Sequence, residues 1–258
     1  MLLGILADVH EDIVRLNESI EIFNAHRVDE VICLGDIVGI CVPYYSYIET
    51  RDSNKVVEWV KENCPISVVG NHDLYAIRKI PVNSERFTFP ANWYDLDFNK
   101  RKEIGGGKIW LYEDRELSAL LNDDNKEYIR TLPEYLIQGY GKYKILYSHY
   151  FYPDVTGCLS VIIKDISELR QHFEFMKQND CLYAFSGNDH FRGIKVFTED
   201  SITEIRLGEK YILPDKPLWL HIPAVANGTQ PNGVAIFNTD TREIEVIPLN
   251  TPPHTYKK

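Results

Sequence analysis

Five short clusters of carboxylate, imidazole and amide side chains each follow directly after an apolar run of the sequence. The clusters are Asp8-Val9-His10, Gly35-Asp36, Gly70-Asn71-His72-Asp73, Ser148-His149 and Gly187-Asn188-Asp189-His190. Their oxygen and nitrogen ligands suit Mn, Fe, Zn or Mg, and the thiolates typical of a structural zinc site are lacking. The spacing therefore predicts metal-ion chemistry at the ends of strands.

Each cluster also has a simple structural interpretation when taken alone, because Gly, Asp and Asn are common turn residues. Their repetition in this order at strand ends favours ligands over turns. Strand side chains alternate with a period of two, so Asp8 and His10 are predicted to point to the same side and chelate one ion. Asp36 has two carboxylate oxygens and can bridge two cations. Further ligands are predicted to come from Asn71, His149 and His190.

The elements that must position the first three clusters alternate between strand and helix. Apolar runs predict strands over residues 2–7, 30–34 and 66–69. Residues 12–25 repeat apolar side chains at helical spacing, and a second helix is predicted to begin with an N-cap at 52–54. This βαβαβ order predicts a sheet with parallel neighbours and a ligand crevice at the carboxyl ends of its strands.

The second half of the chain predicts two more helices and six more strands. The helices are expected over residues 125–132 and 166–177, and the strands over 144–148, 182–186, 193–198, 201–207, 234–238 and 243–248. Residues 82–113 predict a long surface excursion, in which the aromatic segment from Phe87 to Tyr112 is either a source of substrate selectivity or a packed insertion. No repeat or linker divides the chain, so we expect a single domain over residues 1–258.

The charge balance limits the classes of partner. The chain has 28 basic and 38 acidic residues, a net charge of -10, which opposes unspecific binding to nucleic acid or anionic lipid. Bound metal ions reverse the local field, so an anionic substrate stays compatible. Five scattered cysteines predict free thiols in a reducing compartment. With neither a signal peptide nor an apolar run of ~20 residues, we expect a cytoplasmic protein without membrane contact. The sequence predicts no oligomeric state.

The clusters together resemble the motifs of the calcineurin-like metallophosphoesterase superfamily. The first three motifs are represented by Asp8-Val9-His10, Gly35-Asp36-Ile37-Val38-Gly39 and Gly70-Asn71-His72-Asp73. His149 and residues 187–190 match the fourth and fifth by order and spacing, and Pro223 to Gly233 is similar to a C-terminal loop of small bacterial and archaeal members. The resemblance implies an α/β fold, a four-layer α/β/β/α sandwich of two mixed β-sheets flanked by helices. It also implies two divalent metal ions, Mn foremost, with Fe, Zn, Mg or Ni as alternatives.

The resemblance also implies a role for each residue. The first metal would be held by Asp8, His10, Asp36 and His190, and the second by Asp36, Asn71 and His149. His72 would face the leaving oxygen, and Asp73 would orient it. Where the family usually has a second histidine, this chain has Asn188. Asn188 itself, Asp189 or a water would take that place, so we expect a weaker or more selective second metal site.

The implied reaction is hydrolysis of a phosphoester by in-line attack of a hydroxide that bridges the two metals, with His72 protonating the leaving group. A phosphodiester or another small-molecule phosphate is favoured, with dinucleoside polyphosphate hydrolysis as an alternative. The protein Ser/Thr phosphatase branch usually has Gly-Asp-x-x-Asp-Arg-Gly, and this chain has Gly39-Ile40 where the Asp-Arg pair would stand. A non-catalytic metal-binding scaffold is an alternative of a different class, against which the presence of His72 argues.

Other polar residues outside the ligand set have simpler expected roles. Arg78 and Arg192 lie just beyond motifs and could steady a phosphate, although a surface role is simpler. Structural or solvated roles are expected for the four remaining histidines, His26, His172, His221 and His254.

Overall fold

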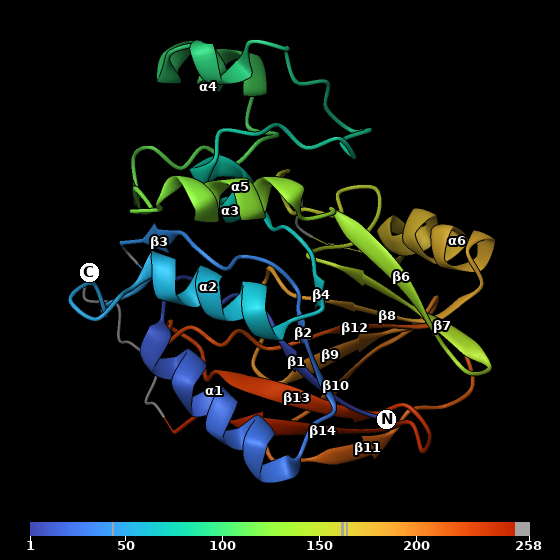
Figure 1. Ribbon diagram of the computed structural model, residues 1–258. Coiled ribbons are helices and arrows are strands. Elements are labelled where there is room, and N and C mark those ends of the chain that lie inside the picture. The colour runs from blue at the N-terminus through green and yellow to red at the C-terminus, as the bar shows by residue number, and fades with distance from the viewer. Residues whose placement is uncertain (43, 161–162, 164, 251–258) are drawn as a thin grey trace.

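The computed structural model describes residues 1–42, 44–160, 163 and 165–250, and its centre is a pair of six-stranded sheets (Figure 1). The first sheet has the order β11 (Lys210–Ile212), β14 (Glu243–Pro248), β13 (Gly233–Asn238), β1 (Leu2–Leu6), β2 (Glu30–Cys33) and β4 (Ile66–Ser67). The second has the order β10 (Ile202–Ile205), β9 (Ile194–Phe197), β12 (Leu218–His221), β8 (Cys181–Ser186), β7 (Tyr143–Ser148) and β6 (Tyr135–Tyr140). Both sheets mix parallel and antiparallel pairs. His254 lies outside the described residues.

Alternation along the strands explains why the sheets are covered on both faces. In β1, Leu3 and Ile5 enter the core between the sheets, whereas Leu6 packs on the opposite face. In β7, Ile145 and Tyr147 enter the same intersheet core, and Leu146 packs outward. Because every second side chain of a strand points the other way, each sheet needs apolar cover on both faces.

Helices provide the outer cover. Leu16 and Phe23 of α1 (Ile13–His26) and Val60 of α2 (Ser53–Asn63) pack on the outer face of the first sheet. Phe173 and Met176 of α6 (Arg170–Gln178), which follows the 3-10 helix η2 (Ile166–Leu169), pack on the outer face of the second. These layers confirm the α/β/β/α sandwich. None of the helices in the described part of the chain has the length and apolar character needed to cross a bilayer.

The two N-terminal helices begin at aspartate caps. The Asp12 carboxylate accepts a hydrogen bond from the Arg15 main-chain N–H at 3.1 Å, and Asp52 accepts one from Lys55 at 3.0 Å. These bonds satisfy main-chain donors that the first turn of a helix leaves free. The N-cap expected at 52–54 is therefore Asp52.

A long insertion lies between α3 (Asn71–Ala76) and α5 (Asp123–Thr131), and Figure 1 shows it rising above both helices. It contains η1 (Trp93–Asp95), α4 (Phe98–Gly105) and β5 (Glu116–Leu117). Phe87, Phe89 and Trp93 form an aromatic cluster of its own. Its end returns to the main body, where β5 pairs antiparallel with β3 (Ile40–Cys41), so that Cys41 lies opposite Glu116.

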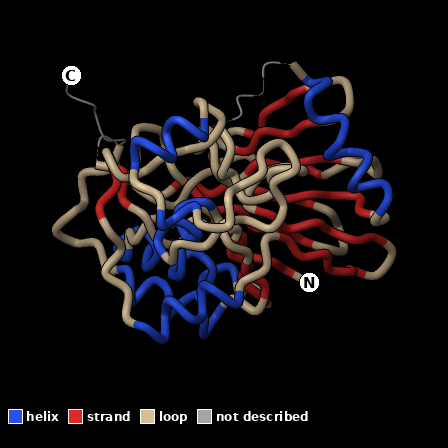
Figure 2. The backbone as a smooth tube through the Cα atoms, turned by 90° about the horizontal axis from the view of Figure 1, so that it is seen from above, coloured by secondary structure: helices blue, strands red, loops and turns tan. Residues whose placement is uncertain are grey.

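Most predicted elements are present, with differences at their ends. The third strand is only Ile66–Ser67, and the third polar cluster opens helix α3. Strands β6, β11 and β12 were not predicted. The hairpin of β13 and β14 is confirmed. Loops occupy much of the side seen from above in Figure 2.

Candidate metal centre

The predicted ligands meet where strands of both sheets end. Asp8 and Asp36 follow strands β1 and β2 of the first sheet, while His149 and His190 follow β7 and β8 of the second. The His149 Nε2 atom lies 3.1 Å from Asp36 Oδ2, and His190 Nε2 lies 3.3 Å from Asp8 Oδ1. Carboxylates of one sheet thus face imidazoles of the other.

Three overlapping groups of side chains could each hold a cation, with ligand atoms within 4.8 Å of one another. They are Asp8 with His10 and His190, Asp8 with Asp36 and His149, and His10 with Asp36 and His72. The first two groups correspond to the two predicted metal positions. Asp8, His10 and Asp36 each belong to two of the three groups, so the groups form one continuous cluster.

Main-chain carbonyls fix the orientation of two of the imidazoles. His10 Nδ1 donates to the Gly39 carbonyl at 2.8 Å, and His149 Nδ1 donates to the Leu34 carbonyl at 2.7 Å. A carbonyl only accepts, so the proton is on Nδ1, and Nε2 of a neutral ring is left with a lone pair toward the centre. Burial lowers the pKa of His10 to about 3, which keeps this ring neutral. Both rings therefore turn Nε2 toward the centre, and the His10 ring is already neutral there.

Asn71 provides a further test of whether the residues of the centre fit a bound cation. Asn71 Nδ2 donates to the Tyr112 hydroxyl at 2.7 Å, whereas its Oδ1 atom is buried and has no hydrogen-bond partner among the described residues. A buried oxygen without a partner is costly, and a bound cation would satisfy it. The donor set of carboxylates, imidazoles and an amide oxygen thus fits a divalent cation at the second position.

Asn188 lies beside this free oxygen. Its main-chain N–H donates to both oxygens of Asp8, at 3.1 and 3.0 Å, and its Nδ2 donates to Asp189 Oδ1 at 3.1 Å. The amide oxygen then points away from Asp189. A Cβ atom placed on Gly157 would lie 2.2 Å from Asn188 Oδ1 and 3.0 Å from Asn71 Oδ1. The two amide oxygens therefore border the same small space.

The backbone at the centre is strained at several of the predicted ligands. A positive φ occurs at Asp8, His10, Asp36, Asn188 and His190, with values of 54°, 47°, 51°, 84° and 51°. Such conformations cost energy in residues other than glycine and collect at functional sites. They also correct the predicted reason for the pairing of Asp8 with His10. Strand β1 ends at Leu6, so a tight left-handed turn, not strand alternation, brings these side chains together.

His72 lies at the edge of the centre and is held by a carboxylate that the sequence analysis did not identify. Its Nδ1 atom is 2.5 Å from Glu116 Oε2, and its Nε2 atom is 3.9 Å from Asp36 Oδ2. Burial lowers the pKa of His72, but the carboxylates of Glu116 and Asp36 outweigh it and raise the value to about 9. Cations bound at Asp36 would offset that carboxylate, which leaves Glu116 as the main partner of the imidazolium.

Asp73 was expected to orient His72, and its contacts are different. Its two oxygens accept from the main-chain N–H groups of Gly70 and Val38, each at 3.0 Å. Burial and the Asp36 carboxylate raise the pKa of Asp73 to about 7. Asp73 thus ties the second motif to the third, and Glu116 rather than Asp73 supports His72.

Charge at the centre is balanced between the two carboxylates and the imidazoles. Burial alone would raise the pKa of Asp36, but His149 and His72 lower it below the usual range of a carboxyl group. Burial likewise opposes a high pKa at His149, but Asp36 and Asp8 raise it to about 10. The Asp36 carboxylate is therefore ionised and available to a cation, which would take the place of the His149 proton.

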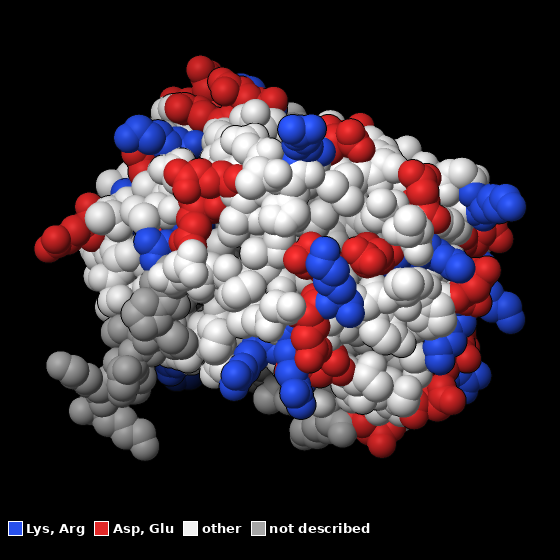
Figure 3. Space-filling model, turned by 90° about the horizontal axis from the view of Figure 1, so that it is seen from below, with Lys and Arg blue, Asp and Glu red and all other residues white. Residues whose placement is uncertain are grey.

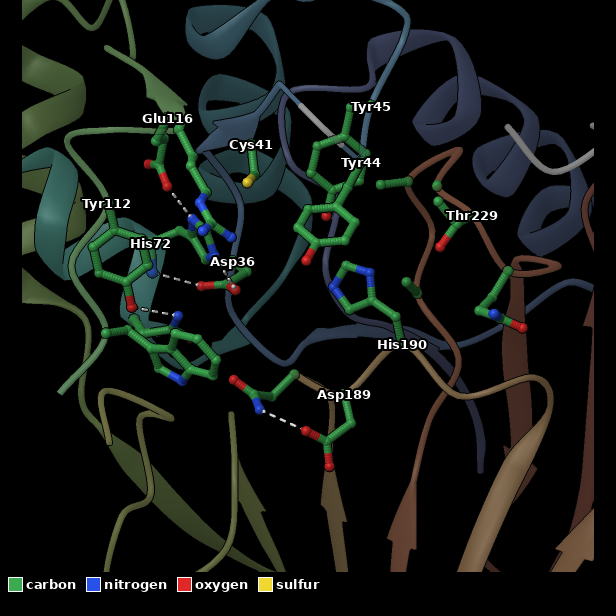
Figure 4. Close-up of a pocket in the computed structure, with 18 of the residues that line it drawn as sticks. Asp36, Cys41, Tyr44, Tyr45, His72, Tyr112, Glu116, Asp189, His190 and Thr229 are labelled. Atoms are coloured by element: carbon green, nitrogen blue, oxygen red, sulfur yellow. Dashed lines mark hydrogen bonds and ion pairs between the residues drawn. The ribbon is translucent and has the colours of Figure 1, made fainter. Parts of the chain in front are cut away.

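A cavity of about 610 Å³ opens from the centre, and we call it the active-site cavity. Figure 4 shows Asp36, His72 and His190 at its base, with Tyr112 and Glu116 on one side and Tyr44 and Tyr45 on the other. Neither Arg78 nor Arg192 lines it. Arg78 donates to the Tyr94 carbonyl instead.

The other described histidines have structural contacts. His26 Nδ1 donates a hydrogen bond to the Ile22 carbonyl, and His172 Nδ1 accepts one from the main-chain N–H of Tyr152. His221 Nε2 accepts from the main-chain N–H of Asp189 at 3.1 Å, which helps to fix the loop that carries Asn188. These contacts agree with the structural roles expected for them.

Comparison with known proteins supports this interpretation of the centre. The sequence model of a family described as calcineurin-like phosphoesterase matches residues 1–192. The chain is 23% identical over 260 residues to an uncharacterized protein of Methanocaldococcus jannaschii, covering 95% of this chain and 86% of that protein.

Solved structures show the same fold. A metallophosphoesterase from Sphaerobacter thermophilus superimposes with a TM-score of 0.67 at 21% identity, covering 98% of this chain and 89% of the other. A hypothetical protein from Pyrococcus horikoshii OT3 superimposes with a TM-score of 0.56 at 12% identity, covering 97% and 88%. The family match covers most of the chain, including the residues that form the centre, from Asp8 to His190. The chain belongs to the calcineurin-like phosphoesterase family and is a metal-dependent phosphoester hydrolase.

Proposed function

We propose that this enzyme hydrolyses a small-molecule phosphoester, a phosphodiester foremost, with two divalent cations of which manganese is the preferred metal. Asp8, His10, Asp36 and His190 would hold the first cation, and Asp36, Asn71, His149 and Asn188 the second. The observation that carries the proposal is the meeting of carboxylates from one sheet and imidazoles from the other around the shared Asp36.

The geometry supports an oxygen ligand at Asn188. Asp189 holds the amide nitrogen, and the Tyr150 hydroxyl donates to Asp189 at 3.0 Å, so the carboxylate is itself fixed. The oxygen of Asn188 then faces the space that it shares with Asn71. Amide oxygens are harder ligands than imidazole nitrogens, and this favours manganese or magnesium at the second position.

Bound divalent cations would supply an activated water and neutralise the charge of the phosphate. The activated water would release a proton to solvent, its oxygen would form a new bond to phosphorus, and the bond from phosphorus to the leaving oxygen would break. Protonated His72 keeps its Nδ1 proton against Glu116, and its Nε2 proton is free for the leaving oxygen. General acid catalysis of this kind typically contributes ~10²–10⁴-fold to the rate.

The surroundings of the second motif argue against a protein Ser/Thr phosphatase. Ile40 stands where that branch usually has its arginine, and it is fully buried against Tyr45 and Ala226. A phosphoprotein would therefore not find the expected bidentate guanidinium at this position. The five cysteines are free thiols in the structure, which supports the further proposal of a cytoplasmic location.

Metal analysis and a phosphoester assay on the same purified sample test the proposal. The protein is stripped with a chelator, reloaded with Mn²⁺ and assayed with bis(4-nitrophenyl) phosphate and 4-nitrophenyl phosphate. We expect two cations per chain, activity that depends on reloading, and a preference for the diester. A fully loaded protein that cleaves neither compound would favour a scaffold role instead.

A further inference from the structure

We propose that the active-site cavity binds a heteroaromatic ring on the arm of the phosphoester that is not the leaving group, as in a nucleoside phosphoester. This inference deepens the proposed function and rests on it. The observation behind it is a pair of aromatic side chains, Tyr44 and Trp110, that line the cavity and are each 47% exposed.

The two aromatic residues come from different sides of the cavity. Tyr44 belongs to the loop after β3, whereas Trp110 belongs to the segment that also carries Tyr112 and Glu116. Figure 4 shows Tyr112 and Glu116 across the cavity from Tyr44. A flat ring that enters between these two walls would meet an aromatic face on either side. Stacking of this kind is favourable and tolerates different rings.

Both aromatic side chains are half exposed. Within the described residues, neither Tyr44 nor Trp110 stacks on another aromatic ring or lies beneath a cation. The contrast is with Phe87, Phe89 and Trp93 of the same insertion, which pack edge to face against one another. Packing thus explains the first part of the aromatic segment, and it leaves Trp110 free for a ligand.

The size and charge of the cavity restrict the ligand further. A volume of about 610 Å³ is within the usual range of small-molecule sites and far exceeds what a phosphate alone fills. Among its lining residues, all in the described chain, Arg115 is the only Lys or Arg, and it lies 3.9 Å from Asp114. A long polyphosphate would need more cationic partners than this.

The third wall of the cavity, formed by Thr229 and Gln230, offers polar groups for the edge of a heterocycle. Thr229 and Gln230 line the cavity, and their side chains make no hydrogen bond with any part of the chain that the structure describes. The amide of Gln230 has both donors and an acceptor, which match the mixed edge of a nucleobase. The ligand that fits all three walls carries one phosphate group at the metal centre and a heteroaromatic ring between Tyr44 and Trp110.

Two phosphodiesters with the same leaving group test this inference. Thymidine 5′-(4-nitrophenyl) phosphate carries a base on its second arm, and ethyl 4-nitrophenyl phosphate carries none. We expect the manganese-loaded enzyme to prefer the thymidine ester by about tenfold in kcat/KM, the order of one stacking interaction. Trp110→Ala and Tyr44→Ala should each reduce the ratio between the two esters toward one.

A matched control is the exposed aromatic Tyr211 on β11, which does not line the cavity. Tyr211→Ala should keep the wild-type ratio, and thermal melts check that all three variants fold. Equal kcat/KM values for both esters in the wild type, or an unchanged ratio in both cavity variants, would overturn the inference while the proposed function stands.

A binding measurement decides the inference even without turnover. Thymidine 5′-phosphate should quench the tryptophan fluorescence of the manganese-loaded protein, inorganic phosphate should not, and Trp110→Ala should remove the difference. If neither ester is cleaved, the proposed function fails and this titration alone decides whether the cavity binds the ring. Quenching that is the same for both ligands would contradict the inference.

Discussion

At the scale of single residues, Glu116 contacts His72, the residue that we propose protonates the leaving group. Glu116→Gln keeps the size of the side chain and removes its charge, so the pKa of His72 should fall. Protonated His72 is then lost at a lower pH, and the alkaline limb of the pH–kcat profile should move to lower pH. We expect about a tenfold loss of kcat at neutral pH, a part of what general acid catalysis contributes, with metal content retained.

Asp114→Asn is the control for this change, because it removes one carboxylate from the same cavity. The contacts of His72 include Glu116 but not Asp114. The pH profile of Asp114→Asn should match that of the wild type. An alkaline limb that moves equally in both variants would reflect the overall charge of the cavity and would contradict the role of Glu116.

Loss of the imidazole itself should separate catalysis from metal binding. His72→Ala should lower kcat by ~10²–10⁴-fold and keep the metal content, because the other ligands remain. Asp36→Ala should lose both turnover and bound metal, since Asp36 contacts His149 and belongs to two of the three ligand groups. Metal analysis with steady-state kinetics distinguishes the two variants. Unchanged turnover in His72→Ala would refute its assignment.

We predict that Asn188 makes the second metal position selective. Titration of the stripped protein should show two sites of unequal affinity for Mn²⁺. Asn188→His replaces an amide oxygen by a nitrogen ligand and should strengthen the second site for Zn²⁺ more than for Mn²⁺. Calorimetric titration with each metal measures the change. Two equally tight sites in the wild type, unaffected by the substitution, would show that Asn188 is not a ligand.

At the scale of elements, the sequence predicts those strands and helices whose residue pattern lies within a short stretch of the chain. Strands β1, β2 and β8 were predicted because apolar runs end at polar clusters. Helix α1 was predicted from helical spacing, and α2 from an N-cap at 52–54. Strand β12 (Leu218–His221) is buried on both faces and lacks an alternating pattern. Short apolar runs of this kind are ambiguous between strand and helix.

Contacts between segments that are far apart in the chain could not be predicted from the sequence. Glu116 lies 44 residues from His72, and it reaches the centre only because β5 pairs with β3 at the end of a long insertion. No motif surrounds it, and a surface acid is the simplest reading of such a residue. Tyr112, which holds Asn71, arrives by the same segment. The candidate ligands were predicted because their motifs come directly after apolar runs, whereas Glu116 and Tyr112 belong to the long insertion between α3 and α5.

The close approach of these elements depends on Gly39, which follows the second motif. Its φ is +100°, and an added Cβ would lie 2.6 Å from His72 Cβ and 2.9 Å from Glu116 Oε1. Gly39→Ala should therefore displace the pair and lower kcat, in addition to a loss of about 1–3 kcal/mol in the free energy of unfolding from backbone strain. Denaturant unfolding and kinetics measure both effects.

Gly141 provides the matched control, since its φ is +60° and an added Cβ meets nothing within 4 Å. Gly141→Ala should lose stability through strain and keep its kcat. Equal kcat values in the two variants would show that room at Gly39 is not needed for the support of His72.

At the scale of the whole molecule, distant parts of the chain share both the core and the metal centre. The first strand, β1, pairs with β13 near the end of the described chain, and the intersheet core takes residues from both halves. We therefore propose that residues 1–258 form one domain. Figure 3 shows acidic and basic side chains interspersed on the face seen from below, so that face offers no broad basic surface to a polyanion.

The cations would join the two sheets, since Asp8 and Asp36 come from one and His149 and His190 from the other. Without cations, the buried carboxylates rely on protonated His149, whose pKa of about 10 is above its unfolded value. The stabilisation of the fold by protonated His149 is complete below pH ~6.5 and is lost as the pH rises through about 10. A raised pKa in the fold means that the unfolded state releases the proton first.

Metal removal should therefore destabilise the protein more at high pH. Chelation should lower the melting temperature, and the difference between loaded and stripped protein should widen from neutral pH to about pH 10, because a neutral imidazole also binds metal more tightly. Differential scanning calorimetry of both forms across this range measures the effect. A constant difference would mean that His149 stays neutral in the stripped protein and that the sheets are held together by their apolar core alone.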